Sequence, residues 1–172
     1  MLYIWGAWFY GYDKNNFELF GYIDGDVCFG TVSDFTDIFD HQYQISNLTD
    51  EEVLSKVRED KIDILIHLGA IGDRPRVRVY AGRAAPIQVE AASLPLGTSE
   101  FDYFWFDRSV VPKETFHAYD GAMVLADGPY FCWTSPINGK NVSDLPFDSH
   151  GFITFGSLNR FVKVTPLCLE VW

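Results

Sequence analysis

The stretch LTDEEVLSKVREDKIDILIHL, residues 48–68, carries the strongest structural signal in the chain. Thr49 stands directly before three acidic residues, so a hydroxyl cap and negative charge would meet the positive end of a helix. Val53, Leu54 and Val57 then recur on one helical face, and the stretch closes with an apolar run typical of strands buried on both faces. The pattern predicts a helix that leads into a parallel strand.

Further short apolar runs lie on both sides of this unit and are separated by Pro and Gly. Strands that alternate with helices favour an open α/β sheet, in which ligands bind at the carboxyl ends of the strands. The strand candidates are FELFGY (17–22), IFDHQYQI (38–45), APIQVEA (85–91), FDYFWFD (101–107), AMVLAD (122–127) and FITFGS (152–157). We expect residues 128–149 to form a long surface connection, which could mark a boundary between lobes, and a helix to begin after Pro166.

The composition of the chain limits the classes of protein to which it could belong. The 172 residues include 48% hydrophobic and 17% aromatic side chains, enough for a sizeable core in one domain. A net charge of −11 argues against binding to nucleic acid or to a membrane surface, because both are negatively charged. Cys28, Cys132 and Cys168 form no CxxC pair, so we expect no disulfide framework and no zinc site, and a cytoplasmic location fits best.

The histidines leave two interpretations open. His67 ends the predicted strand KIDILIH (61–67), so its side chain could reach a ligand at the sheet edge, although a buried, hydrogen-bonded structural histidine is the favoured interpretation. His41, His117 and His150 stand in loop-like contexts and are expected to be solvated. None has metal-ligand spacing, so no metal is proposed, and the absence of a GxSxG motif makes a hydrolase a weak hypothesis.

Two segments could bind an anion. The run 69–83 is rich in arginine: a guanidinium cluster could hold an anionic group, but a solvated helix face is favoured. The run FGSLNRFVK, residues 155–163, places backbone N–H groups and the ammonium of Lys163 where they could contact phosphate oxygens, although it is not a P-loop. The arginines of the first run are Arg74, Arg76, Arg78 and Arg83.

Several of these motifs, taken in order, resemble a known family. The segments IDILIHLGAIGDRPRVRVYAGRAAPIQVEAASLPLGTSEFDY and GFITFGSLNRFVKVTP are similar to the catalytic region of the O-GlcNAc transferase and SPINDLY-like glycosyltransferases, glycosyltransferase family 41. The family pattern runs roughly DILVDLSGHT, RPAPVQV, GYPGT, a DY strand and FGSFNNxxKxxP, and FELFGY matches the family's FEVFCY. The resemblance covers nearly the whole chain from about residue 16 onward.

The resemblance implies a two-lobed GT-B fold with Rossmann-like lobes, here residues 1–150 as the first lobe and 151–172 as the start of the second. It also implies transfer of a sugar, commonly GlcNAc from UDP-GlcNAc, to Ser or Thr of a protein, with the UDP-sugar as co-substrate and no other cofactor. In this chain Lys163 matches the catalytic lysine that contacts the diphosphate, and Asn159 and Arg160 match neighbouring nucleotide-sugar positions, with Arg160 in place of an amide. The residues assigned to the substrate loop are Gly97, Thr98 and His67.

The chain also departs from the family pattern. Ala70 and Ile71 replace a glycine and a histidine, so a candidate acid-base imidazole is missing. By comparison with the family, we expect the chain to be truncated at both ends and inactive as an isolated polypeptide. The alternative is a non-catalytic α/β binding or interaction module derived from the family, and unpaired strand edges could allow self-association.

Overall fold

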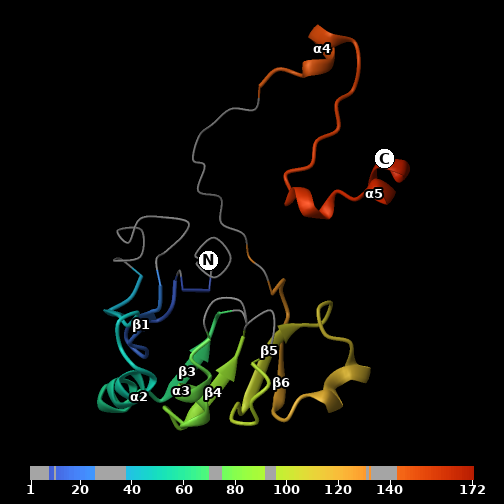
Figure 1. Cartoon of the computed structure of the whole chain (residues 1–172). Coiled ribbons are helices and arrows are strands. Elements are labelled where there is room, and N and C mark those ends of the chain that lie inside the picture. Colours follow the sequence, from blue (N-terminus) through green and yellow to red (C-terminus); the bar gives the residue numbers. More distant parts are fainter. Residues whose placement is uncertain are drawn as a thin grey trace. The chain divides into compact units, whose positions relative to one another are not determined.

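The computed structural model describes residues 8–9, 11–25, 38–69, 75–91, 96–130, 132 and 143–172. The chain divides into two compact units, Met1–Pro136 and Ile137–Trp172 (Figure 1). Within the described residues, no helix is long and apolar enough to cross a membrane. The predicted lobe boundary at residue 150 stays a prediction.

A four-stranded sheet forms the centre of the first unit, and its strands run side by side in chain order (Figure 1). Each neighbouring pair is parallel, so all four carboxyl ends lie at the same edge. The strands are β3 (Ile64–His67), β4 (Ile87–Glu90), β5 (Tyr103–Asp107) and β6 (Ala122–Ala126). The predicted α/β class with parallel strands is confirmed.

Two further strands pair in parallel with each other, β1 (Phe20–Ile23) and β2 (His41–Gln44). Their tyrosines attach them to the helix that follows. The hydroxyl of Tyr22 donates to Asp60 at 2.7 Å, and the ammonium of Lys56 lies 3.8 Å from the ring centroid of Tyr43. Because Lys56 also contacts Asp60 at 2.6 Å, one carboxylate joins this small sheet to the helix.

The helix α2 (Asp50–Glu59) begins where the sequence predicts it. The hydroxyl of Thr49 accepts from the backbone N–H of Glu52, while the Glu52 carboxylate accepts from the N–H of Thr49, which completes a capping box. Val53 and Val57 are the buried side chains of its apolar face. The helix then leads into β3, as expected.

The described residues of the first unit form two hydrophobic clusters. Elements β2, α2, β3 and α3 (Val77–Ala81) contribute the first, and β5 with the segments around it contributes the second. Leu65 and His67 of β3 are buried, but Ile64 on the other face is 49% exposed, so the expectation of burial on both faces is wrong there. The first cluster contains Ile45, Val53, Val57, Leu65, Val79, Ala84 and Ala85, and the second contains Phe101, Phe104, Phe106, Val111 and Tyr130.

The second unit contains only short helical segments among its described residues: α4 (Pro146–His150), η3 (Phe161–Lys163) and α5 (Pro166–Val171). The helix after Pro166 is confirmed. The strand predicted for FITFGS is wrong, since residues 152–157 have no strand structure and Phe155 is 92% exposed. An apolar run needs a neighbouring strand to satisfy its backbone, and the described residues of this unit include none.

Candidate functional site

The candidate site begins with a buried pair at the carboxyl ends of β3 and β4. His67 and Glu90 are the last residues of these strands and are partners in the parallel register. The imidazole Nδ1 lies 2.7 Å from the Glu90 carboxylate oxygen Oε1, with 7% and 0% of the two side chains exposed. The favoured interpretation of His67 as a buried, hydrogen-bonded histidine is therefore confirmed, and it lies at the edge where ligands of such sheets bind.

The same carboxylate reaches the loop that contains the predicted substrate-loop residues. Its other oxygen, Oε2, accepts from the backbone N–H of Leu96 at 3.0 Å. Gly97 follows with a φ of +70°, a backbone conformation that glycine adopts without strain. The hydroxyl of Thr98 then accepts from the N–H of Glu100 at 3.4 Å. The structure thus brings His67 and the Gly97–Thr98 loop together through Glu90.

Two aromatic rings fix the orientation of the imidazole. The centroid of the His67 ring lies 5.1 Å from Tyr80 in an edge arrangement and 6.3 Å from Phe101 in a stacked one. Burial raises the pKa of the Tyr80 hydroxyl, and the negative charge of Glu90 adds to this effect. The tyrosine therefore stays neutral beside the carboxylate.

A second polar group supports the carboxyl ends of β4 and β5. The Asp107 carboxylate accepts from the hydroxyl and N–H of Ser109, from the N–H of Val110 and from the N–H of Tyr130. These hydrogen bonds, that of the Ser109 hydroxyl first, lower the pKa of Asp107 to about 2. The hydroxyl of Tyr130 donates to the carbonyl of Ala91, so one buried side chain ties the two strand ends together.

An open pocket of about 320 Å³ lies beside this group, at the carboxyl ends of β5 and β6. Because the carboxylate of Asp107 already accepts several internal hydrogen bonds, it supports the wall of the pocket rather than offering a vacant acceptor. The lining residues are Asp107, Arg108, Ser109, Ala126, Asp127, Gly128 and Pro129.

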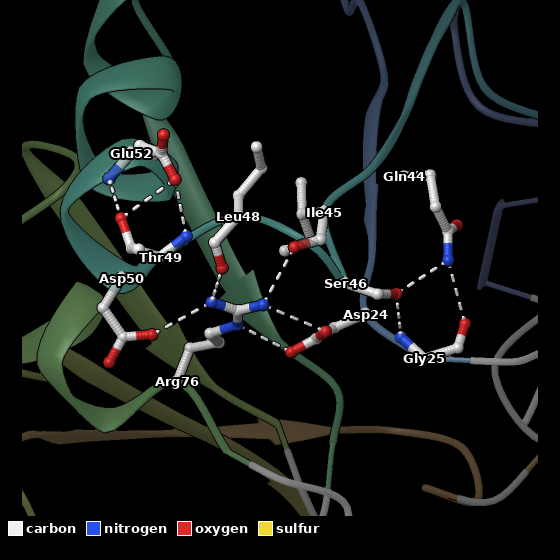
Figure 2. Close-up of polar contacts among 10 residues, drawn as sticks. All are labelled: Asp24, Gly25, Gln44, Ile45, Ser46, Leu48, Thr49, Asp50, Glu52 and Arg76. Atoms are coloured by element: carbon white, nitrogen blue, oxygen red, sulfur yellow. Dashed lines mark hydrogen bonds and ion pairs between the residues drawn. The ribbon is translucent and has the colours of Figure 1, made fainter.

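Arg76 joins three separate segments of the first unit (Figure 2). Its guanidinium donates to the Asp24 carboxylate at 2.7 and 3.2 Å and to Asp50 at 3.1 Å. It also donates to the carbonyls of Leu48 at 2.6 Å and Ile45 at 2.8 Å. Asp24 is the main cause of the raised pKa of Arg76.

The sequence allowed Arg76 to be either an anion ligand or a solvated residue, but the structure shows that it is an internal clamp, a side chain that joins segments of the chain by hydrogen bonds. Arg83 is a second internal clamp, because its guanidinium binds Asp102 at 3.1 to 3.2 Å and the carbonyls of Glu100 and Pro86. The favoured solvated-face interpretation is therefore wrong for both. Arg78 is exposed, as expected, and Arg74 lies outside the described residues.

The predicted nucleotide-sugar residues share one exposed segment of the second unit. The side-chain oxygen of Asn159 accepts from the N–H of Arg160 at 2.9 Å, and the N–H of Lys163 donates to the carbonyl of Arg160 at 2.9 Å. The thiol of Cys168 donates to the carbonyl of Lys163 at 3.5 Å, which joins the segment to α5. Their contact with a nucleotide stays a prediction.

The other three histidines lie outside the His67–Glu90 pair. The loop predicted for His41 is wrong, since it lies in β2, contacts Glu18 at 2.7 Å and stacks on Phe20. His117 and His150 are exposed, as expected. Across the ranges that the structure describes, no group of three or more His, Cys, Asp and Glu side chains could hold a metal ion.

Sequence reasoning missed Glu90 as part of the site. A usable signal was present, because both His67 and Glu90 are ionisable residues that end apolar strands. What the sequence lacked was the register that makes these two ends neighbours. Ala70, Ile71, Ser93 and Leu94, where the chain departs from the GHT and GYPGT patterns, lie outside the described residues.

No family model matches the chain. The chain is nevertheless similar to several known glycosyltransferases. The chain is 35% identical over 130 residues to a probable UDP-N-acetylglucosamine-peptide N-acetylglucosaminyltransferase SPINDLY of Eustoma exaltatum, which covers 74% of this chain and 14% of that protein. The Arabidopsis thaliana SPINDLY is 34% identical over the same shares of the two chains. The Arabidopsis thaliana protein SEC is 27% identical over 146 residues, 77% of this chain and 15% of that protein.

A solved structure agrees with these matches. A lysine-to-methionine mutant of the Thermobaculum terrenum O-GlcNAc transferase superposes with a TM-score of 0.65 and 29% sequence identity. The match covers 73% of this chain and 25% of that one. The chain therefore shares its α/β fold with part of a much longer enzyme.

Proposed function

The chain is related over 74% of its length to the O-GlcNAc transferase and SPINDLY-like glycosyltransferases, and on that premise we propose that it forms part of the catalytic region of a protein O-glycosyltransferase. The proposed reaction transfers GlcNAc from UDP-GlcNAc to a Ser or Thr hydroxyl of a protein. The observation that supports it best is the 35% identity over 130 residues to a protein whose name states that activity.

In the proposed mechanism, the acceptor hydroxyl attacks the anomeric carbon of the sugar, the glycosidic C–O bond to the diphosphate breaks, and UDP leaves. Negative charge grows on the leaving phosphate, and the ammonium of Lys163 would stabilise it, with Asn159 and Arg160 on the same segment contacting the nucleotide-sugar. The exposed position of Lys163 leaves its ammonium accessible to a ligand. The reaction needs the UDP-sugar as co-substrate and uses no other cofactor.

The acceptor side of the proposed site is the Gly97–Thr98 loop with His67. The glycine keeps the loop backbone free of a side chain, so an extended acceptor segment could approach its amides closely. Glu90 holds this loop beside the imidazole through the two contacts described above. Orientation of the hydroxyl would then be the main contribution of this side of the site.

The wider assignment follows the same family. We assign residues 1–150 to the first lobe of a GT-B fold and residues 151–172 to the start of the second, and we place the protein in the cytoplasm. Its partners would be a UDP-sugar donor and a protein acceptor. The net charge of −11 disfavours nucleic acid and membrane surfaces.

A non-catalytic binding module is the second candidate function. It is favoured by Ala70 and Ile71, which occupy the positions of the family's glycine and histidine. On this proposal the fold persists without transfer chemistry.

The deciding experiment is a calorimetric titration of the chain with UDP. We expect binding, and we expect Lys163→Ala to weaken it by about tenfold or more, since a hydrogen bond to a charged group contributes about 1.5–3 kcal/mol. Lys113→Ala is the matched control, because it removes an exposed lysine from η2 (Lys113–Ala118) of the other unit.

Equal UDP affinity of the wild type and Lys163→Ala would remove Lys163 from the mechanism. Absence of any UDP binding would favour the non-catalytic module over the transferase.

A further inference from the structure

Glu90 is a fully buried carboxylate with a specific partner on each side. Its side chain is 0% exposed, its Oε1 lies 2.7 Å from Nδ1 of His67, and its Oε2 accepts from the N–H of Leu96 at 3.0 Å. A buried carboxylate is tolerated only where hydrogen bonds compensate for its lost hydration. Here those bonds connect the end of β3 to the loop before β5.

The contact also decides which nitrogen of the imidazole carries the proton. A carboxylate can only accept hydrogen bonds, so Nδ1 of His67 is the donor, and in the neutral form of the imidazole Nε2 carries the lone pair. Among the described residues, the imidazole is hydrogen-bonded through Nδ1. Edge contact with Tyr80 and stacking on Phe101 keep the ring from turning.

The direction of Nε2 follows from its distance to the backbone beyond β3. A Cβ atom built on Gly69 would lie 2.8 Å from Nε2, closer than real contacts allow. The nitrogen therefore faces Gly69, two residues along the chain at the carboxyl edge of the sheet, and a side chain at position 69 would collide with it.

We propose that Glu90 is a positioning residue of the sugar-transfer site: one of its oxygens holds His67 with Nε2 as the acceptor for a substrate hydroxyl, and the other holds the Leu96–Thr98 loop. This inference rests on the proposed function and deepens it. The hydroxyl belongs either to the Ser or Thr of the acceptor or to the GlcNAc of the donor. Both offer the same hydrogen-bond chemistry, and the experiment separates them.

The test is NMR spectroscopy of the whole chain with ¹⁵N-labelled histidine, with His67→Gln to assign the signals. In the free wild type we expect the Nδ1–H tautomer of His67. UDP-GlcNAc and, separately, UDP with a Ser-containing peptide are then added. A shift of the Nε2 resonance with UDP-GlcNAc assigns the hydroxyl to the sugar, and a shift only with the peptide assigns it to the acceptor.

Substitution of the carboxylate supplies the second readout. Glu90→Gln should change the tautomer distribution of His67 and weaken binding of the ligand that shifts Nε2 by up to about tenfold, the range of one lost hydrogen bond. Glu114→Gln makes the same chemical change at an exposed position and should alter neither. If Glu90→Gln does not fold, the tautomer and ligand response of the wild type still decide.

The outcomes separate this inference from the proposed function. A proton on Nε2 in the free chain overturns the inference whatever binds. Ligand binding that depends on Lys163 but leaves the Nε2 resonance unchanged overturns the role of Glu90 and keeps the transferase proposal. No binding of either ligand overturns both.

Discussion

Both units of this chain contain apolar segments, but the phenylalanines of these segments are buried in the first unit and exposed in the second. In the first unit, Phe104 and Phe106 of β5 are 5% and 2% exposed. In the second, Phe155 and Phe161 are 92% and 86% exposed. Since the side chains are of one kind, the difference lies in what surrounds them: β5 has a parallel strand on each side, whereas residues 152–157 have none among the described residues.

The comparison shows that an apolar run alone does not make a strand. A strand becomes stable when neighbours satisfy its backbone N–H and C=O groups and cover its side chains. The polar side chains of the two units differ in the same way, in how many internal contacts they make. Asp107 of the first unit accepts several internal hydrogen bonds, whereas Lys163 of the second contributes only its backbone to the contacts described.

The strongest test of this contrast exchanges one phenylalanine for alanine in each unit. Phe106→Ala should lower the free energy of unfolding by about 4 kcal/mol, because it removes a buried ring and leaves a cavity. Phe155→Ala should change it by less than about 0.5 kcal/mol. Urea unfolding followed by tryptophan fluorescence measures both, since Trp105 stacks on Trp8 at 4.5 Å in the first unit.

A large loss of stability in Phe155→Ala would show that Phe155 is buried in solution and would end the contrast between the units. A small loss of stability in Phe106→Ala would also end the contrast, because it would show that burial of Phe106 contributes little to the first unit.

The sequence predicted the local features of the first unit well, for a physical reason. Thr49, the acids after it and the apolar face at Val53 and Val57 lie within nine residues, so capping and periodicity suffice to place α2. The strands were also found, because each is a short apolar run between turn residues. These signals are complete within a few residues of chain.

The candidate site was only half visible, because its contacts are not local. Arg76 binds Asp24, which is 52 residues away, and His67 binds Glu90, which is 23 residues away. Neither pairing follows from composition or spacing until the order and register of the strands are known. The strand prediction for FITFGS is wrong for the same reason: a strand depends on a neighbouring strand, and the local sequence does not show whether one is present.

Arg76 allows the next test, since it joins segments that only the folded first unit brings together. Arg76→Ala should lower the free energy of unfolding by about 3 kcal/mol, because it leaves two carboxylates and two carbonyls without their donor. Arg78→Ala is the matched control: the same change at an exposed position of α3 should cost less than about 0.5 kcal/mol. Equal urea midpoints for the two variants would mean that the clamp does not contribute to stability.

The smallest expected effect compares two helix caps, one in each unit. The hydroxyls of Thr49 and Thr165 each accept from the backbone N–H three residues later, at 3.2 and 3.3 Å. Thr49→Ala should destabilise the first unit by about 1 kcal/mol, because α2 is packed against its core and fraying of its first turn weakens that packing.

Thr165→Ala should leave the same urea transition unchanged, although it removes a cap of nearly identical geometry. The helix α5 has six residues and no buried side chain, so its cap stabilises a turn that unfolds by itself and contributes nothing to a cooperative core. A matching loss in both variants would show that α5 unfolds together with the first unit, and the two units would then form one cooperative structure in solution.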